Sequence, residues 1–199
     1  MGLDMYLYAS KYISGWSWQK DQKKNEEYEK LVEFSGVRAH EGSPHGNLEM
    51  CVGYWRKANA IHGWFVREVQ DGIDDCKRNY VPREKLIELK KVCQEALDNQ
   101  PAIVPASASG IAQYTYVGGD DKSDKSIGQA LMDIWQLEQK SAEFNDPNDT
   151  DPLKPTMGSF FGSYEKDEWY YQELRDTIEI VDTCLAMDGE WDFYYRSSW

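Results

Sequence analysis

The two ends of the chain carry the clearest strand pattern in the sequence. Apolar and more polar side chains alternate over 3–8, and aromatic side chains alternate in the same way over 191–196. A period of two is typical of a strand that buries one of its faces. The residues expected on the buried faces are Leu3, Met5, Leu7, Trp191, Phe193 and Tyr195. Because a strand needs a neighbour for its backbone groups, we expect both chain ends to form one small antiparallel sheet.

Helix patterns lie between these two strands. Apolar residues recur at helical spacing over 83–98 and over 167–187, and Gly189 follows the second of these stretches. A charged stretch that begins at Lys20 predicts a solvated helix ending near Gly36. The fold class that follows is α+β, with a small antiparallel sheet from both chain ends packed against three or four helices.

A stretch in the middle of the chain, 52–69, crowds aromatic, cationic, amide and imidazole side chains onto what we expect to be one helix. At 3.6 residues per turn, Trp55, Asn59 and His62 share one face of that helix. A buried amide or imidazole needs a hydrogen-bond partner, because leaving it unpaired costs free energy. The stretch therefore fits either a ligand-facing helix or a core helix that contains a satisfied histidine.

The composition changes between Pro101 and Thr156, where small, polar and Pro/Asp-rich segments surround one expected helix at 126–144. This region has too little apolar mass to fold alone. We therefore expect a single domain over 1–199, in which 101–156 is an insertion that acts as a lid or an oligomer contact. The next segment, GSFFGS at 158–163, is expected to form a short strand whose glycines let backbone or ligand approach closely.

The charge balance limits the partners of the chain. With 22 Lys and Arg against 35 Asp and Glu, the net charge is −13, which repels nucleic-acid backbones and anionic membrane surfaces. We find no apolar run long enough to span a bilayer and no signal-peptide pattern. The four cysteines are scattered without a CxxC pair, as expected of reduced thiols. We expect a cytoplasmic protein that binds neither nucleic acid nor membrane.

Several blocks of the sequence, in order, resemble a family of poorly characterised proteins that occur mainly in bacteriophages, prophages and bacteria. The blocks are MGLDMYL, YWRKANAIHGWFV with VQDGIDDC, PTMGSFFGS with YEKDEWYY, and DFYYRSSW. Residues 101–151 lie outside the resemblance. The resemblance implies a phage or prophage origin, a bacterial host cytoplasm, and a host-directed or accessory role. It supplies no catalytic residues.

If these blocks meet in space, they offer a site for a small anion. Arginine matches phosphate and carboxylate groups, and aromatic rings stack on planar bases. A local group of cations in an acidic protein would concentrate such an anion. We therefore expect non-catalytic binding and sequestration of a small anionic, nucleotide-derived ligand, in a phage setting that favours evasion of host defence. The expected ligand-binding residues are Trp55, Arg56, Lys57, Asn59, His62, Phe161, Ser163, Tyr195 and Arg196.

Two other functions stay open at this stage. In the first, an acidic phage protein docks on a basic host protein. In the second, a hydrolase or transferase uses His62 as its general base, oriented by Asp74 or Asp75. The sequence has no phosphate loop, nucleophile elbow or zinc-protease motif, so the second has less support. We expect no cofactor and no metal, and a homo-oligomer would fit a site completed by a neighbouring chain.

Overall fold

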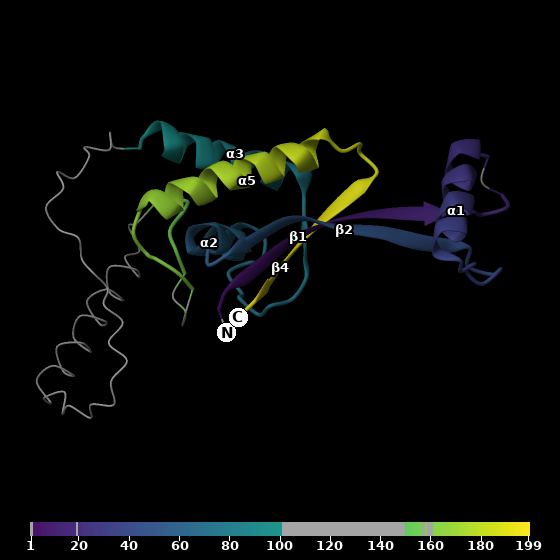
Figure 1. Ribbon diagram of the computed structural model, residues 1–199, viewed down its shortest axis with the longest axis horizontal. Helices are drawn as coiled ribbons and strands as arrows, with labels where there is room; N and C mark the ends of the chain where they lie inside the picture. Colours follow the sequence, from purple (N-terminus) through teal and green to yellow (C-terminus); the bar gives the residue numbers. More distant parts are fainter. Residues whose placement is uncertain (1, 19, 101–149, 157, 159–160) are drawn as a thin grey trace, which may run out of the picture.

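The two ends of the chain lie side by side in the centre of a four-stranded antiparallel sheet (Figure 1). The computed structural model describes residues 2–18, 20–100, 150–156, 158 and 161–199. The strand order is β2-β1-β4-β3. The strands are β1 (Asp4–Ser14), β2 (His45–Arg56), β3 (Asn79–Val81) and β4 (Trp191–Ser198). Because β1 and β4 come from the chain ends, the sheet confirms the prediction made from the alternating pattern.

The register of β1 and β4 explains which face of the sheet is buried. Leu7 lies opposite Tyr195, and both side chains are fully buried. The next pair, Tyr8 opposite Tyr194, points to the other face and is half-buried. Side chains alternate between the two faces of a strand, so a single register fixes the core face of both. The expected buried residues follow this rule, although Trp191 is only half-buried.

Four helices occur in the described residues, and three of them share the core. They are α1 (Gln22–Ser35), α2 (Asn59–Glu68), α3 (Arg83–Asp98) and α5 (Glu168–Ala186). Helices α3 and α5 lie side by side, whereas α1 lies at the far end of β1 and β2 (Figure 1). The bounds of α3 match the predicted 83–98, and those of α5 differ from 167–187 by one residue at each end. The α+β prediction is confirmed.

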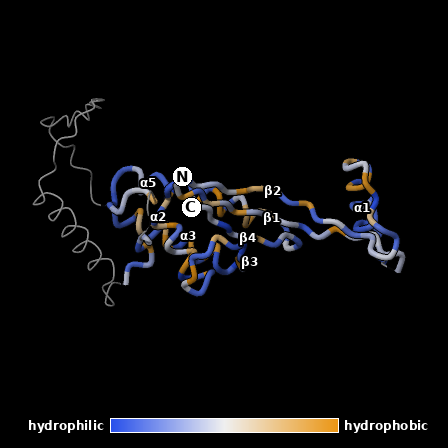
Figure 2. Tube along the Cα trace, turned by 90° about the horizontal axis from the view of Figure 1, so that it is seen from below, coloured by the Kyte–Doolittle hydropathy of each residue, from blue (hydrophilic) through white to orange (hydrophobic). Residues whose placement is uncertain are grey.

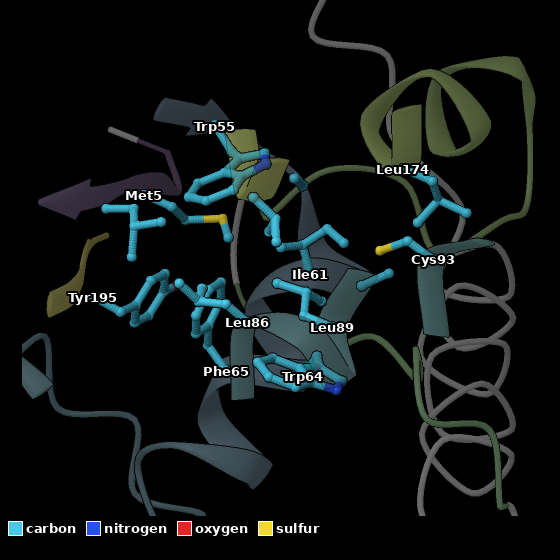
Figure 3. Close-up of a cluster of buried hydrophobic side chains, with 14 of the residues drawn as sticks. Met5, Trp55, Ile61, Trp64, Phe65, Leu86, Leu89, Cys93, Leu174 and Tyr195 are labelled. Atoms are coloured by element: carbon cyan, nitrogen blue, oxygen red, sulfur yellow. The ribbon is translucent and has the colours of Figure 1, made fainter. Parts of the chain in front are cut away.

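The core forms where α2 meets the sheet and the α3–α5 pair (Figure 3). The ring of Phe65 on α2 stacks on that of Tyr195 on β4, with centroids 3.9 Å apart. Trp64 and Ile61 are also fully buried, and Leu86 and Leu89 reach the same cluster from α3. Burying one such side chain contributes about 1.5–3 kcal/mol, so this cluster is the main stabilising element of the fold.

The prediction of one helix over 52–69 is wrong in its first part. β2 continues to Arg56, and α2 begins only at Asn59. Val52, Tyr54 and Trp55 are of the β-branched and aromatic types that strands favour, and β1 pairs with this segment on both sides of an irregularity at Val52. Trp55 therefore does not share a helix face with Asn59 and His62. The loop that follows α1 ends before His45, where β2 begins.

Most of the expected insertion, 101–149 with its helix at 126–144, lies outside the described residues. The described end of it lies against α2. Leu153 is 1% exposed and belongs to the core, and Arg67 donates hydrogen bonds to the carbonyl oxygens of Pro152 and Lys154, at 3.0 and 2.8 Å.

The strand expected at 158–163 is absent from the described residues of that segment, 158 and 161–163. Phe161 instead turns back, its N–H 3.4 Å from the carbonyl oxygen of Gly158. A Cβ at Gly158 would lie 2.5 Å from the Phe161 ring, so glycine does allow the close approach that we expected there.

Candidate functional site

A pocket of about 280 Å³ lies where the end of β2, the start of α2 and the N-terminal end of α5 meet. Three separated segments of the chain line it: 56–60, 153–155 and 162–173. The last of these includes the loop that precedes α5. Since the segments are far apart in sequence, the pocket exists only in the folded chain.

The turn between β2 and α2 places two cations at this pocket. Lys57 has a left-handed backbone, with φ of 62°, and this turns the chain from the strand into the helix. Its N–H donates to the carbonyl oxygen of Leu3 at 2.8 Å, and its own carbonyl oxygen accepts from the N–H of Asn59 at 2.8 Å. The side chains of Arg56 and Lys57 are exposed, and neither forms an ion pair with another described residue.

Gly162 holds the loop before α5 against this turn. Its φ is 107°, a conformation that residues with a side chain rarely adopt. A Cβ at Gly162 would lie 2.3 Å from the carbonyl oxygen of Lys57, which is too close for any side chain. The backbone of the loop can therefore reach the turn only because this residue is glycine.

Asn59 places a fixed amide in the wall of the pocket. The side chain is 1% exposed, and its Oδ1 accepts hydrogen bonds from the N–H of Thr156 at 2.9 Å and from its hydroxyl at 3.0 Å. Because the oxygen takes both donors, the orientation of the amide is set. Its Nδ2 is buried and has no hydrogen-bond partner among the described residues. Leaving a buried donor unpaired costs about 1–3 kcal/mol.

One acid of the lining, Glu173, is mainly protonated at neutral pH. Burial, and after it the negative charges of Asp167 and Asp176, raise the pKa of the Glu173 carboxyl to about 8. A neutral carboxyl adds no negative charge to the pocket and has a proton to donate. A perturbed carboxyl in a concave site is also a common mark of functional sites.

The remaining charges of the lining favour an anion. Asp167 caps α5, and its carboxylate accepts a hydrogen bond from the N–H of Tyr170 at 2.9 Å. With Glu173 protonated, three cations and two ionised acids line the pocket, and one of these cations, Lys166, forms an ion pair with Asp151 at 2.8 Å. These five charged residues are Arg56, Lys57, Lys166, Glu165 and Asp167. Arg56 and Lys57, which have no acidic partner among the described residues, can concentrate small anions even though the whole protein is acidic.

Three aromatic side chains line the pocket, and two of them are exposed. Trp169 is 76% exposed, and Tyr164 is 36% exposed. The hydroxyl of Tyr164 donates to the carbonyl oxygen of Gly158 at 3.1 Å and accepts from its N–H at 3.3 Å, which holds the ring in place. Exposed rings beside cations provide stacking surfaces for planar ligand groups.

The pocket brings together four of the nine ligand-binding residues expected from the sequence: Arg56, Lys57, Asn59 and Ser163. Ser163 is exposed, and its Oγ accepts a hydrogen bond from the N–H of Glu165 at 3.1 Å. The other five expected residues do not line this pocket.

Trp55 and Phe161 belong to the core. Trp55 is 4% exposed, and its Nε1 donates to Oγ1 of Thr177 at 2.9 Å. Phe161, also 4% exposed, meets the ring of His62 edge-on at 5.4 Å. Neither ring presents a free face, so the structure does not bring them to the pocket as stacking groups.

His62 and Tyr195 form a buried polar chain with Asp74 (both rings are fully buried). The Nδ1 atom of His62 lies 2.7 Å from the hydroxyl of Tyr195, and its Nε2 lies 2.9 Å from Oδ2 of Asp74. Burial, and after it the charge of Asp74, raises the pKa of the Tyr195 hydroxyl well above its usual value. The predicted pairing of His62 with Asp74 is present, whereas Asp75 instead pairs with Lys77. Both ring nitrogens of His62 are engaged, so this histidine has no free nitrogen with which to act on a substrate.

Arg196 lies on the other face of the sheet, because it follows the buried Tyr195 along β4. There it borders a shallow depression of about 550 Å³ together with Tyr8 and Arg78. The guanidinium of Arg78 lies over the ring of Tyr194, 4.1 Å from its centroid. Arg196 therefore does not line the pocket that Arg56 and Lys57 line.

Sequence reasoning missed part of the lining, including Tyr164, Lys166, Trp169 and Glu173. Two signals could have found some of them. Asp167 stands where a helix cap is expected, directly before the helical pattern of 167–187, and helix N-terminal ends often border sites for anions. Glu173 lies next to Leu174, an acid at the edge of an apolar stripe, where burial perturbs its pKa.

Comparison of the chain with known protein families, with curated proteins and with solved structures found no match. Within the part of the chain that the structure describes, no three His, Cys, Asp or Glu side chains are grouped so that they could hold a metal ion. The described helices also include none with the length and apolar character needed to cross a membrane. The function is therefore argued from the geometry of the pocket.

Proposed function

We propose that this chain binds and holds a small anionic, nucleotide-derived ligand in the pocket between β2, α2 and α5. The observation that carries the proposal is the Asn59 amide, which is buried, fixed by Thr156, and left with an unpartnered Nδ2 donor among the described residues. Arg56 and Lys57 stand beside it with no acidic partner among those residues. An amide donor and two cations in one pocket fit a ligand that offers acceptor atoms and negative charge.

The cations suit a phosphate or carboxylate group. The planar guanidinium of Arg56 can donate two parallel hydrogen bonds to such a group, whereas the ammonium of Lys57 acts as a mobile point charge. The protonated carboxyl of Glu173 would donate a further hydrogen bond to an acceptor without adding charge. The anionic end of the ligand therefore belongs near the turn at 56–57.

The rings and the size of the pocket suit a single planar group. Trp169 and Tyr164 border the opening and offer surfaces for stacking on a base. A volume of about 280 Å³ lies near the lower limit of roughly 300–1,000 Å³ for small-molecule sites. This size supports a mononucleotide or a similarly small derivative over a polymer.

Holding the ligand is the better supported role than converting it. The described part of the lining contains no histidine and no cysteine, and the hydroxyl of Ser163 accepts a backbone hydrogen bond. A catalytic site would need a nucleophile or base within reach of the ligand. In the phage setting that the sequence resemblance implies, we propose that holding the ligand withdraws a host signalling nucleotide.

The test is native mass spectrometry of the protein purified from its host, with denaturing release and identification of any bound molecule. We expect a stoichiometric phosphorylated molecule that is lost from Arg56→Ala. Arg196→Ala is the matched control, because it removes an exposed arginine that does not line the pocket. A protein that stays empty after incubation with host nucleotide extract, or equal losses from both variants, would refute the proposal.

A further inference from the structure

We propose that two copies of this chain associate through an arm formed by residues 10–50. The arm consists of the distal part of β1, the helix α1 and the distal part of β2. It projects along the long axis of the molecule, away from α2, α3 and α5 (Figures 1 and 2). The N-terminal end of α5, which borders the pocket, lies at the opposite end of the molecule from α1 (Figure 1), so this inference does not depend on the proposed function.

The arm leaves the sheet where its central pairing stops. β4 pairs with β1 only as far as Lys11, so 12–14 have β2 as their one strand neighbour in the described residues. β2 is an edge strand, and its residues Leu48 to Cys51 are all exposed. An exposed edge with free backbone donors and acceptors is a ready template for a second chain.

The arm also exposes apolar side chains to an unusual degree. Phe34 is 89% exposed and Trp18 is 73% exposed. Six of the thirteen large hydrophobic side chains that are exposed in the described residues lie here: Tyr12, Trp18, Phe34, Val37, Leu48 and Met50. Single exposed apolar residues are normal, but a concentration of them in one projecting element marks an interaction surface.

Aromatic rings connect part of this set into a strip. The ring centroids of Tyr12 and His45 are 5.3 Å apart, those of His45 and Trp16 are 6.4 Å apart, and those of Trp16 and Trp18 are 5.8 Å apart. Each aromatic side chain can bury about 150–250 Å², and a stable interface buries about 800 Å² on each partner. The exposed rings of Tyr12, Trp18 and Phe34 would thus supply on the order of half of the required area.

Local interactions hold the arm in a defined conformation. The ring of Tyr28 is 4% exposed and packs so tightly on Gly15 that a Cβ there would lie 2.3 Å from it. Asp21 caps α1 by accepting hydrogen bonds from its first turn, and Gly36 ends the helix with φ of 67°. Since these local interactions already order the arm, its exposed side chains are displayed in fixed positions.

Charge identifies a second copy as the partner. Residues 10–50 carry six cations and seven acids, a net charge of −1, which leaves −12 on the rest of the chain. The remaining residues of two copies repel each other because each set carries this negative charge. Contact through the near-neutral arms avoids most of that electrostatic repulsion. In a twofold arrangement each arm would cover the apolar surface of the other, because a closed dimer uses the same patch on both copies.

The test is sedimentation velocity of the full chain over a range of micromolar concentrations. We expect wild-type dimers, and at least about tenfold weaker association in Phe34→Glu and in Met50→Glu. Ile87→Glu is the matched control, because Ile87 is 55% exposed on α3, outside the arm. Circular dichroism and thermal melting of each variant show whether it remains folded, and Met50→Glu tests the other side of the arm independently of α1.

Three results would overturn the proposal. The first is a monomeric wild type at every concentration. The second is a dimer that neither arm variant weakens, or that Ile87→Glu weakens equally. The third is a monomer that captures a host protein through Phe34 and Met50, since the arm would then serve a different partner.

Discussion

The Nε2 atom of His62 lies 2.9 Å from one carboxylate oxygen of Asp74, and the other oxygen of that carboxylate accepts a hydrogen bond from Nε1 of Trp199 at 3.0 Å. One half-buried acid thereby joins α2, the loop that follows it and the residue after β4. The carboxylate can only accept, so the imidazole donates from Nε2, while its Nδ1 faces the hydroxyl of Tyr195. This chain satisfies a polar ring inside an aromatic core.

We expect Asp74→Asn to lower the free energy of unfolding by about 1–3 kcal/mol, because it weakens a charge-assisted hydrogen bond to a buried ring. The matched control is Asp75→Asn. Asp75 pairs with Lys77, whose side chain is 77% exposed, so that change should cost less than about 0.5 kcal/mol. Urea unfolding at neutral pH measures both variants. Equal costs would show that the bond to His62 is not stabilising.

The same acid should shape the response to low pH. Burial alone would raise the pKa of Asp74, but the hydrogen bond and charge of His62, together with the bond from Trp199, hold it below its ordinary value. A depressed carboxyl pKa contributes stability that is present above the unfolded value of about 3.9 and is lost as the pH falls through the folded value. Wild type should therefore lose more stability than Asp74→Asn on acidification. If the free energy of unfolding of the two proteins fell equally with decreasing pH, the result would contradict this expectation.

Glu173 should show the opposite dependence on pH. Its pKa is about 8 against an ordinary 4.5, so the folded chain keeps a proton that the unfolded chain has released. Stability then falls as the pH rises between these two values. We expect wild type, but not Glu173→Gln, to lose about 2 kcal/mol between about pH 5 and about pH 9, after allowance for partial exposure of the side chain.

Urea unfolding of both proteins at the two pH values measures this difference. The control is Glu165→Gln, which removes an exposed acid of the same pocket and should keep the wild-type loss. If Glu173→Gln loses as much stability as wild type, another group is responsible.

Local pattern predicted most of the fold. The alternation at both chain ends placed β1 and β4, and apolar spacing placed α3 and α5 to within a residue. The prediction of one helix over 52–69 was wrong because pairing with β1 determines the strand part of this stretch. No periodicity within the stretch itself indicates that pairing. The chain turns from β2 into α2 at Lys57, which has a positive φ. Positive φ values are most common at glycine and asparagine, so a lysine gives no sign of this turn in the sequence.

The candidate site could be predicted only where its residues are neighbours in sequence. Arg56, Lys57 and Asn59 stand together because one short turn holds them. Arg196 was grouped with them on charge alone, and in the structure it borders a separate depression with Tyr8 and Arg78. Glu173 reaches the pocket because α5 packs against β2, a long-range contact that composition does not encode.

Gly162→Ala tests whether the pocket depends on the close contact between the loop before α5 and the turn at Lys57. The added Cβ would meet the carbonyl oxygen of Lys57 at 2.3 Å, and the φ of 107° disfavours any side chain. We expect a loss of about 1–3 kcal/mol in the free energy of unfolding, and weaker retention of the ligand, because the loop must move away from the turn. Gly189→Ala is the control, since a Cβ there meets nothing within 4 Å. Urea unfolding and native mass spectrometry measure the two effects separately. If Gly162→Ala were as stable as Gly189→Ala and kept the ligand, the loop would not form the wall of the site, and the anion would have to be held by Arg56, Lys57 and Asn59 alone.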